Sequence, residues 1–384
     1  MTSGKTILIL GGGIGGIVAA TELRKKLSSQ HRIVVIERLA DHVFPPSLLW
    51  VASGARDAKQ ISKPVSSLAR KGIEVIQGTI EKIDAEKKAV MVNGQQLHGD
   101  YLIIATGAEL APETVPGLMA AGHNLYSLEG AQAIRSASLK LNKGKVVVLV
   151  CSMPFKCPAA PYEAAMLLES DFRKRGLAKN VSVEIYSPEP GPMPVTGPEV
   201  SQQVRTMVES KGVTYFPQHA VKEIDPVMRE IHFANGDKTS FDLLVYIPPH
   251  RAPTVVREAG LLGENGWIPV DRFNLATKYQ DVYAIGDVAG IPLKNGKPLP
   301  KAGVLAHGQA EVVANNIAVA VNGSGDTESF NGHGECFLEI GDGMAGMGKG
   351  NFYAEPNPDI KMKPPGRLLH FGKILFEKYW LYRI

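Results

Sequence analysis

The sequence predicts an α/β protein with two Rossmann-like dinucleotide-binding domains, the first split in the sequence, plus a C-terminal membrane-associating segment. Three observations lead to this fold class. A glycine-rich turn follows a short apolar run near the N-terminus, two further strand-and-turn patterns occur at 100–107 and 281–287, and a second strand–helix–strand pattern begins near residue 145. The predicted domain ranges are 1–115 and 265–325 for the split domain, 116–264 for the second domain, and 326–384 for a C-terminal region.

The composition is that of an ordinary globular protein. Hydrophobic residues make up 44% and charged residues 21% of the 384 residues, and the formal charge is only +4. This charge is too small to indicate a nucleic-acid partner. No apolar run approaches the roughly 18 residues of a membrane-spanning helix, and the first residues lack the apolar core of a signal peptide. We therefore expect a cytoplasmic protein whose cysteines are kept reduced.

The first turn has the pattern of a dinucleotide site. Residues 11–16 read GGGIGG between an expected strand at 6–10 and a helix that reaches about residue 27, and a second strand follows at 32–36. The first glycine allows a tight turn, the second lets the backbone approach a pyrophosphate, and the third lets helix and strand pack closely. The helix N-terminus favours phosphate, and the acid after the second strand accepts hydrogen bonds from a ribose. The expected cofactor contacts are Gly11, Gly13, Gly16, Glu37 and the adjacent Arg38.

Two later segments indicate which dinucleotide is bound. Residues 100–107 read DYLIIATG and residues 281–287 read DVYAIGD, each a short strand that ends in a turn of small residues. They resemble the later fingerprints of flavoproteins with two dinucleotide-binding domains. That resemblance implies FAD as cofactor and FAD contacts at Thr106, Gly107, Gly286 and Asp287. An alternative role for Asp287 is the N-cap of the following helix, and both roles are compatible.

The equivalent turn of the second domain contains no glycine. After an expected strand at 145–150, residues 151–161 read CSMPFKCPAAP, before a helix around 162–175 and a strand at 181–186. In pyridine-nucleotide-dependent relatives this turn carries a second glycine fingerprint. Side chains at every position, and three prolines without N–H groups, leave no backbone cradle for a pyrophosphate. The sequence thus predicts a second domain that keeps the fold and has lost the NAD(P)H site.

Two cysteines are candidate redox residues. Cys157 precedes the expected helix, whose dipole together with Lys156 would favour the thiolate over the thiol. Cys336 lies 179 residues later in the stretch GECFLEIG at 334–341, and the spacing does not show whether the two meet. Cys151, at a strand end, fits a small buried apolar side chain. Without a Cys-x-x-Cys, and with His333 as the one nearby imidazole, the sequence indicates no metal site.

Taken together, these residues resemble the sulfide:quinone oxidoreductase family. Besides the FAD fingerprints, the resemblance rests on FPPSLLWVASG at 44–54, KCPAAPYE at 156–163, PKAG at 300–303 and GEC at 334–336. The pattern is also similar to the flavoprotein subunit of flavocytochrome c sulfide dehydrogenase, which is exported, whereas this chain shows no signal. The resemblance implies FAD-dependent oxidation of sulfide to polysulfide or elemental sulfur, with electrons passed to a membrane quinone.

The resemblance also implies roles for single residues. Cys157 and Cys336 would form a disulfide that HS⁻ attacks, which leaves a persulfide and a free thiolate. His123 or Glu163 would give acid–base help, although each is also an ordinary surface or capping residue. Lys301 would place a cation at the flavin edge and near the quinone, with a solvated loop lysine as the alternative.

The C-terminal tail concentrates the positive charge. Residues 360–384 carry six basic residues against one acid, and the apolar residues recur at helical spacing. This composition is typical of an amphipathic helix lying on anionic lipid, and a helix docked on its own core or on a second copy is the alternative. The expected lipid face consists of Leu368, Phe371, Ile374, Leu375, Tyr379, Trp380, Leu381 and Tyr382, flanked by Lys373, Lys378 and Arg383. Before it, Phe352 and Tyr353 are expected to stack on the quinone ring, although loop aromatics are also common anchors.

Two other functions stay open. A type II NADH:quinone dehydrogenase would share the fold and the acceptor, but the glycine-free turn speaks against it. A flavin-binding redox sensor would report oxidation through the same disulfide without turnover. For the main hypothesis we expect sulfide and quinone as partners and peripheral, monotopic association with the cytoplasmic face of the cell membrane. A homo-oligomer is compatible with the sequence, which does not define the oligomeric state.

Overall fold

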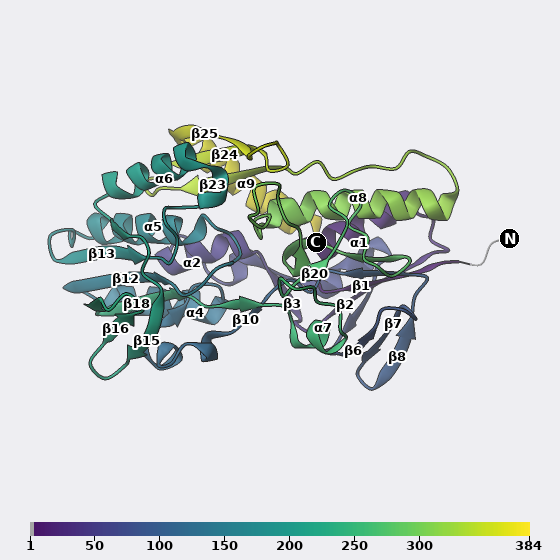
Figure 1. Cartoon of the computed structure of the whole chain (residues 1–384), viewed down its shortest axis with the longest axis horizontal. Coiled ribbons are helices and arrows are strands. Elements are labelled where there is room, and N and C mark those ends of the chain that lie inside the picture. The colour runs from purple at the N-terminus through teal and green to yellow at the C-terminus, as the bar shows by residue number, and fades with distance from the viewer. Residues whose placement is uncertain (1–3) are drawn as a thin grey trace.

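Two five-stranded parallel sheets form the two lobes of the computed structural model, which describes residues 4–384 (Figure 1). The first sheet runs, in spatial order, β21 (Val282–Ala284), β9 (Tyr101–Ile104), β1 (Thr6–Leu10), β2 (Arg32–Glu37) and β5 (Glu74–Gln77). The second runs β11 (His123–Asn124), β18 (Leu243–Ile247), β12 (Gly144–Val150), β13 (Val181–Tyr186) and β14 (Thr214–Phe216). Because β21 follows the whole second sheet in sequence, the first domain is split, as predicted.

The two sheets are built with the same connections. In each, the central strand leads through a helix to its neighbour, and an antiparallel three-stranded meander precedes the strand on the other side of the central strand, β9 or β18. The helices are α1 (Ile14–Lys26) and α5 (Ala160–Lys174), and the meanders are β6 (Ile80–Asp84), β7 (Ala89–Val92) and β8 (Gln95–His98), and β15 (Val221–Asp225), β16 (Glu230–Phe233) and β17 (Lys238–Ser240). The turns after β1 and after β12 therefore occupy equivalent places.

The central strands are apolar because both of their faces are covered. Along β1, Ile7 and Ile9 join the core that contains α1, whereas Leu8 and Leu10 face the core on the meander side. Along β12, the side chains at 146, 148 and 150 pack on the α5 side, and those at 147 and 149 on the other. Parallel strands buried on both faces are expected to read as continuous apolar runs, as these do.

Shorter elements join and cover the two lobes. The remaining helices are α2 (Leu48–Ser53), α3 (Leu118–Ala121), α4 (Leu128–Lys140), α6 (Pro198–Ser210), α7 (Thr254–Glu258) and α8 (Gly303–Asn322). Two-stranded pairs are β3 (Asp41–Val43) with β4 (Ser62–Pro64), β10 (Glu109–Leu110) with β19 (His250–Arg251), and β20 (Ile268–Pro269) with β22 (Ala289–Gly290). The β10–β19 pair lies where the chain passes between the two domains, and Arg251 donates to Glu109 there.

The C-terminal region adds an antiparallel sheet and a helix. The sheet consists of β23 (His333–Glu339), β24 (Ala345–Asn351) and β25 (Asp359–Gly366), and α9 (Arg367–Arg383) follows directly. The tail helix thus begins after Gly366, because residues 364–366 belong to β25. Trp380 and Leu381 pack in the core of the first domain, so part of the predicted lipid face is buried. Between residues 4 and 384, no helix has both the length and the apolar character needed to cross a bilayer.

Candidate active site

The turn after β1 has the geometry of a pyrophosphate cradle. Gly11 has a φ of 106°, and a Cβ there would lie 2.5 Å from the carbonyl oxygen of Ala105. A Cβ on Gly16 would lie 1.9 Å from the carbonyl oxygen of Gly11, so strand and helix meet too closely for a side chain. A Cβ on Gly13, the N-cap of α1, would meet nothing within 4 Å. Open space therefore lies in front of the helix N-terminus, where a phosphate is favoured.

Polar groups beside this turn fit a nucleotide. The Glu37 carboxylate accepts hydrogen bonds from the backbone N–H groups of Gly12 at 2.6 Å and Leu39 at 2.9 Å, which hold it at the end of β2. The Thr106 hydroxyl is buried and has no hydrogen-bond partner, a condition that native proteins rarely leave unresolved. Arg38 is exposed, and no hydrogen bond or ion pair of residues 4–384 includes it. The orphaned hydroxyl and the open glycines fit the FAD contacts expected here.

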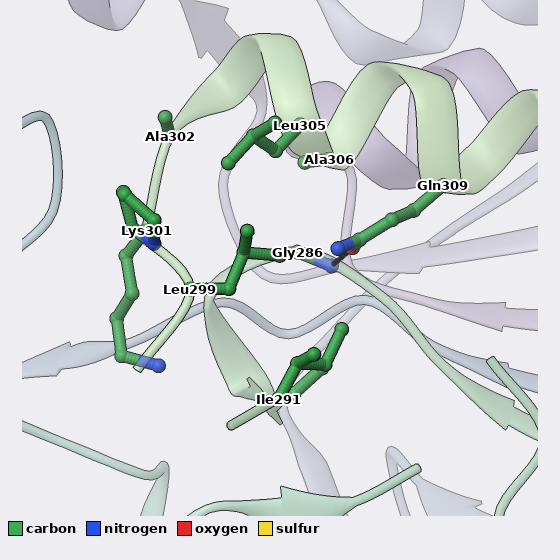
Figure 2. A pocket seen from close by; sticks show the side chains of 10 residues that line it. Gly286, Ile291, Leu299, Lys301, Ala302, Leu305, Ala306 and Gln309 are labelled. Atoms are coloured by element: carbon green, nitrogen blue, oxygen red, sulfur yellow. Dashed lines mark hydrogen bonds between the residues drawn. The ribbon is translucent and has the colours of Figure 1, made fainter. Parts of the chain in front are cut away.

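Gly286, Lys301 and Gln309 line a small pocket between the second FAD segment and the start of α8 (Figure 2). The backbone N–H of Gly286 donates to Gln309 Oε1 at 2.7 Å. The buried Lys301 side chain donates from Nζ to the carbonyl oxygen of Asp287 at 2.5 Å and lies 3.3 Å from the Trp267 ring centroid. Burial lowers the pKa of Lys301 to about 8, so this residue is not the solvated loop lysine of the alternative.

The Asp287 side chain lies near two lysines: Lys156 in the turn after β12, and Lys301 just before α8. Burial raises the pKa of its carboxyl group, and the positive charges of Lys156 and Lys301 oppose that rise. The expected alternative, an N-cap role, is wrong, because Ala302 occupies the N-cap position of α8. Asp287 lies instead in a short 3₁₀ turn at Gly286–Val288. Its carboxylate is left available for the cofactor contact that the fingerprint implies.

The cysteine-containing turn after β12 packs directly against Lys301. The backbone N–H of Cys157 donates to the carbonyl oxygen of Lys301 at 2.6 Å. The Tyr126 hydroxyl donates to the carbonyl oxygen of Lys156 at 2.6 Å, which holds the same turn from the other side. Cys157 itself has a φ of 51°, a left-handed conformation that side chains rarely adopt. Folding thus places Cys157 next to the FAD residues at 286–301.

The two candidate redox cysteines are close in space. A negative charge on Cys336, which lies on β23, would raise the pKa of Cys157, so the two thiols are electrostatic neighbours despite their separation in sequence. Both are free in this structure, Cys157 half-buried and Cys336 exposed. Cys151 is free and buried, and burial raises the pKa of its thiol, as expected for a small apolar side chain.

The expectation of a thiolate at Cys157 is wrong for the reduced protein. The protein packed around Cys157 raises the pKa of its thiol well above the ordinary value, and the charges of Cys336 and Glu163 raise it further. The helix dipole acts weakly because α5 begins only at Ala160. Cys336 is open to solvent on one side, yet burial of its surroundings raises the pKa of its thiol to about 12. Both residues are therefore neutral thiols when reduced.

A buried set of charges adjoins the cysteines. Glu163 Oε1 on α5 accepts from Lys373 Nζ on α9 at 2.9 Å and from the Glu339 backbone N–H at 2.8 Å. Glu339 in turn contacts His370 Nδ1 at 3.0 Å. Burial opposes the charge of Lys373, but Glu163 and Glu339 outweigh it and raise the pKa of Lys373. Lys373 therefore stays charged, and its charge lowers the pKa of both cysteines.

The assignment of Lys373 to a lipid-facing flank is therefore wrong. Its side chain is buried beside Trp50, with Nζ 5.2 Å from the ring centroid. A signal for this was present, because Lys373 and Glu377 lie one turn apart, opposite the line of Leu368 and Leu375. Glu377 is also buried, and its carboxylate accepts from Arg56 Nε at 2.9 Å. Helical periodicity alone did not show which face of α9 points inward.

Three other predicted site residues lie elsewhere. His123 pairs with Val245 in the second sheet, burial lowers its pKa, and no contact of residues 4–384 joins it to either cysteine. Tyr353 donates from its hydroxyl to the carbonyl oxygen of Arg272 at 2.8 Å, and the guanidinium of Arg272 lies 4.1 Å from its ring centroid. Phe352 packs against the core of the first domain. The Tyr353 ring thus anchors the loop to Arg272, and the quinone-stacking role stays a prediction.

One half-buried residue near the flavin segment, His250, was not identified from the sequence. His250 follows β18, and its ring lies 5.6 Å from that of Tyr126. Its Nδ1 contacts the carbonyl oxygen of Pro248 at 2.8 Å, whereas Nε2 is buried without a partner. Burial, with the charges of Lys156 and Lys301, lowers the pKa of His250 to about 3, so the ring is neutral. The sequence did offer one signal for His250: it follows an apolar run that forms a parallel strand, and ligands bind at the carboxyl ends of such strands.

Comparison with known proteins agrees with this geometry. The family model described as "Pyridine nucleotide-disulphide oxidoreductase" matches residues 5–310. The sulfide-quinone reductase of Aquifex aeolicus is 28% identical over 99% of this chain and 91% of its own length, and the mitochondrial sulfide:quinone oxidoreductase of Mus musculus is 23% identical over 91% and 79%. The X-ray structure of the Aquifex aeolicus sulfide:quinone oxidoreductase superposes with a TM-score of 0.88 at 26% identity, covering 99% of this chain and 91% of that chain. The chain therefore belongs to the pyridine nucleotide-disulphide oxidoreductase family, as an FAD-dependent oxidoreductase similar along its length to sulfide:quinone oxidoreductases.

Proposed function

We propose that this protein oxidises sulfide through a Cys157–Cys336 redox pair and passes the electrons by way of FAD to a quinone in the membrane. The observation that carries the proposal is the position of the pair. Folding brings together two cysteines far apart in sequence, and the turn that holds Cys157 is hydrogen-bonded to Lys301 at the FAD segment. A disulfide beside a two-electron cofactor is the arrangement that sulfide oxidation requires.

The chain's own residues account for the sulfur chemistry. With the pair oxidised, HS⁻ attacks one sulfur, the S–S bond breaks, and a persulfide forms on one cysteine while the other leaves as a thiolate. FAD, when bound, supplies a group that can accept two electrons from the cysteine pair and donate them to the quinone. The buried surroundings raise the pKa of both thiols, so the leaving thiolate needs a nearby cation or proton source. Lys373 supplies the cation and Glu163, bonded to it at 2.9 Å, is the acid–base group we assign. A second HS⁻ then attacks the outer sulfur of the persulfide and leaves with it as the shortest polysulfide, which frees the second cysteine thiol. The dithiol would re-form the disulfide by giving its two electrons to bound FAD. The product is polysulfide, from which elemental sulfur separates.

The glycine-free turn argues against a type II NADH:quinone dehydrogenase. Residues 151–161 offer no glycine and three prolines, and the backbone N–H of Cys157 is already used by Lys301. A redox sensor without turnover would need no electron acceptor in the membrane. The exposed face of α9, described next, favours an enzyme that meets a lipid-soluble acceptor.

We also propose that α9 rests on the membrane surface. Leu368 is 85% exposed and Phe371, Leu375, Tyr379 and Tyr382 are also exposed, all along one side of the helix. Three charged residues of α9, Lys373, Glu377 and Arg383, point the other way, into the protein, where each has an oppositely charged partner, whereas Arg367 and Lys378 are exposed. An apolar stripe that faces solvent on an otherwise docked helix is typical of a membrane contact.

Two experiments test these proposals. Purified enzyme should reduce a short-chain quinone with sulfide as donor and not with NADH; quinone reduction by NADH alone would overturn the assignment. The variant L368S/F371S/L375S should be released from vesicles while its flavin reduction by sulfide is unchanged, because none of the three side chains contacts the cysteines. Undiminished vesicle binding by this variant would contradict the role of α9.

A further inference from the structure

A second pocket lies at the C-terminal end of α9, away from the cysteines. It has a volume of about 230 Å³ and is lined by Thr21, Arg24, Lys25, Lys71 and Arg383. These residues come from α1, from the short helical segment that ends at Lys71, and from the last turn of α9. Since a water molecule takes about 30 Å³ in the liquid, the pocket has room for a phosphate group with its glycerol.

The lining is strongly basic. Four of its five residues are cations, and the fifth is a hydroxyl. The acid that pairs with this group is Glu22, which contacts Lys25 Nζ at 2.8 Å and also accepts from Arg383. In the part of the chain that the structure describes, Lys71 forms no hydrogen bond or ion pair through its side chain. The pocket therefore keeps an excess of positive charge and free donors, which an anion would satisfy.

The cations at the pocket's inner wall are fixed in place. Arg24 donates to the carbonyl oxygens of Leu27 at 2.8 Å and His31 at 3.0 Å, which ties its guanidinium to the end of α1. Arg383 donates from Nε to the Thr21 hydroxyl at 3.2 Å. A wall of fixed cations with two lysines at the rim is a built site for an anionic group, because the wall loses little conformational entropy when the anion binds.

The position of the pocket relates it to the exposed stripe of α9. Arg383 is adjacent to Tyr382, which is 86% exposed, and Tyr379 is exposed one turn earlier. Tyrosines are enriched at the level of lipid headgroups, whereas Leu368 and Phe371 at the other end of the stripe suit the acyl region. A helix lying on a bilayer by this stripe would hold the pocket at headgroup level.

We propose that this pocket binds the headgroup phosphate of an anionic phospholipid and so fixes the orientation of α9 on the membrane. The inference rests on the proposed membrane association of α9, and it adds a lipid-selective site that the apolar stripe alone would not provide. Lys25 and Lys71 recognise the phosphate from the rim, and the positive charges of Arg24 and Arg383 in the wall favour the anion.

The test compares the variant K25Q/K71Q with the control K82Q/K87Q. Like the test variant, the control replaces one ion-paired lysine and one lysine without a partner: Lys87 pairs with Asp84, and Lys82 has no partner among the described residues. Both control lysines lie on the meander face of the first sheet, opposite α9. Wild type and control should bind vesicles of phosphatidylcholine and phosphatidylglycerol roughly tenfold more tightly than K25Q/K71Q, and all three should bind pure phosphatidylcholine vesicles alike. Equal losses in both variants, or no loss in either, would overturn the proposal.

A soluble arm separates failure of the pocket from failure of membrane docking. Dihexanoyl phosphatidylglycerol below its micelle concentration should raise the melting temperature of wild type and of L368S/F371S/L375S, but not of K25Q/K71Q. This result would support the pocket even if wild type failed to bind vesicles, an outcome that would reject only the docking of α9. No shift in wild type, or an equal shift with inorganic phosphate at the same concentration, would overturn the assignment to a lipid headgroup.

Discussion

The turn after β1 and the turn after β12 occupy the same position in two sheets with the same strand connections, yet they serve different chemistry. In the first, three glycines clear a space in front of the N-terminus of α1. In the second, the chain fills that space with side chains, and Cys157 bonds through its backbone to Lys301 of the first domain. The two equivalent turns therefore differ: one is open in front of a helix N-terminus, and the other carries Cys157 and bonds to the first domain.

Each domain also has an acidic residue at or just after the strand that follows its first crossover helix, and these two acids differ as the two turns do. Glu37 lies at the end of β2, half-exposed, with its carboxylate held by two backbone N–H groups beside the glycine turn. Glu189, three residues past β13, is buried and accepts from the hydroxyls of Tyr162 at 2.6 Å and Ser187 at 3.1 Å. A carboxylate placed to bind a ribose in one domain thus has its counterpart turned into the core of the other.

The largest expected effect comes from the cysteines. Cys157→Ser or Cys336→Ser should lower the rate of flavin reduction by sulfide on the order of a thousandfold or more, because neither variant has a disulfide to attack. FAD should stay bound, since neither cysteine is among its expected contacts, which lie in the first domain. The rate is measured by stopped-flow absorbance without oxygen. Cys151→Ala is the control and should keep the wild-type rate; full activity in both serine variants would reject the cysteine mechanism.

The next effect concerns the ion pair that the second domain forms with α9. Lys373→Met leaves Glu163 buried and unpaired, which should cost about 3 to 5 kcal/mol of the free energy of unfolding, and adding Glu163→Gln should restore most of it. Denaturant unfolding measures both. Because Lys373 lowers the pKa of both cysteines, alkylation of the reduced single variant Lys373→Met should require a higher pH than in wild type. An unchanged pH profile would show that Lys373 does not act on the thiols.

Glu189 gives the pH dependence of stability. Burial raises its pKa to about 7, so the folded state prefers the protonated acid; this contribution is present at acid pH and is lost as the pH rises through about 7. Glu189→Gln should therefore be more stable than wild type at pH 8 by up to about 3 kcal/mol, and the difference should largely vanish near pH 5. Thermal unfolding at both pH values measures it. A difference independent of pH would contradict a neutral Glu189 in the folded protein.

The smallest expected effect tests the first turn. A Cβ on Gly13 meets no protein atom, so Gly13→Ala should fold normally, but its methyl group would enter the space assigned to the pyrophosphate. We expect FAD to bind roughly tenfold more weakly, as measured by flavin fluorescence during titration of the apoprotein. A matched change in the second turn, Ser152→Ala, should leave FAD affinity unchanged. Wild-type affinity in Gly13→Ala would place the cofactor elsewhere.

Local patterns predicted the fold well because each has a local physical cause. The runs at 6–10 and 145–150 are apolar since both faces of a central parallel strand are buried, and β13 begins and ends where it was expected. What failed depends on contacts between distant segments. The pKa of Cys157 is raised by burial among distant segments and further by Cys336 and Glu163, and Lys373 is held inward by an acid on α5. No spacing along the chain reports such pairs.

Contacts between distant segments also explain why the prediction for the C-terminal tail was only partly right. Composition predicted a helix with an apolar side, and α9 has one, but Trp380 and Leu381 pack inward beside polar residues while Leu368 and Tyr382 face out. Which apolar residues are covered depends on the shape of the groove between the two domains. The aromatic residues at 352 and 353 show the converse, since composition alone does not separate a ligand platform from the loop anchor that Tyr353 forms with Arg272.

The most direct test of the difference between the two turns is flavin absorbance of the purified holoenzyme in the absence of oxygen. Sulfide should bleach the oxidised flavin band within seconds, because the second turn supports a disulfide beside FAD, and NADH should leave the band unchanged, because that turn offers no pyrophosphate site. Bleaching by NADH together with no response to sulfide would contradict the account of the second turn.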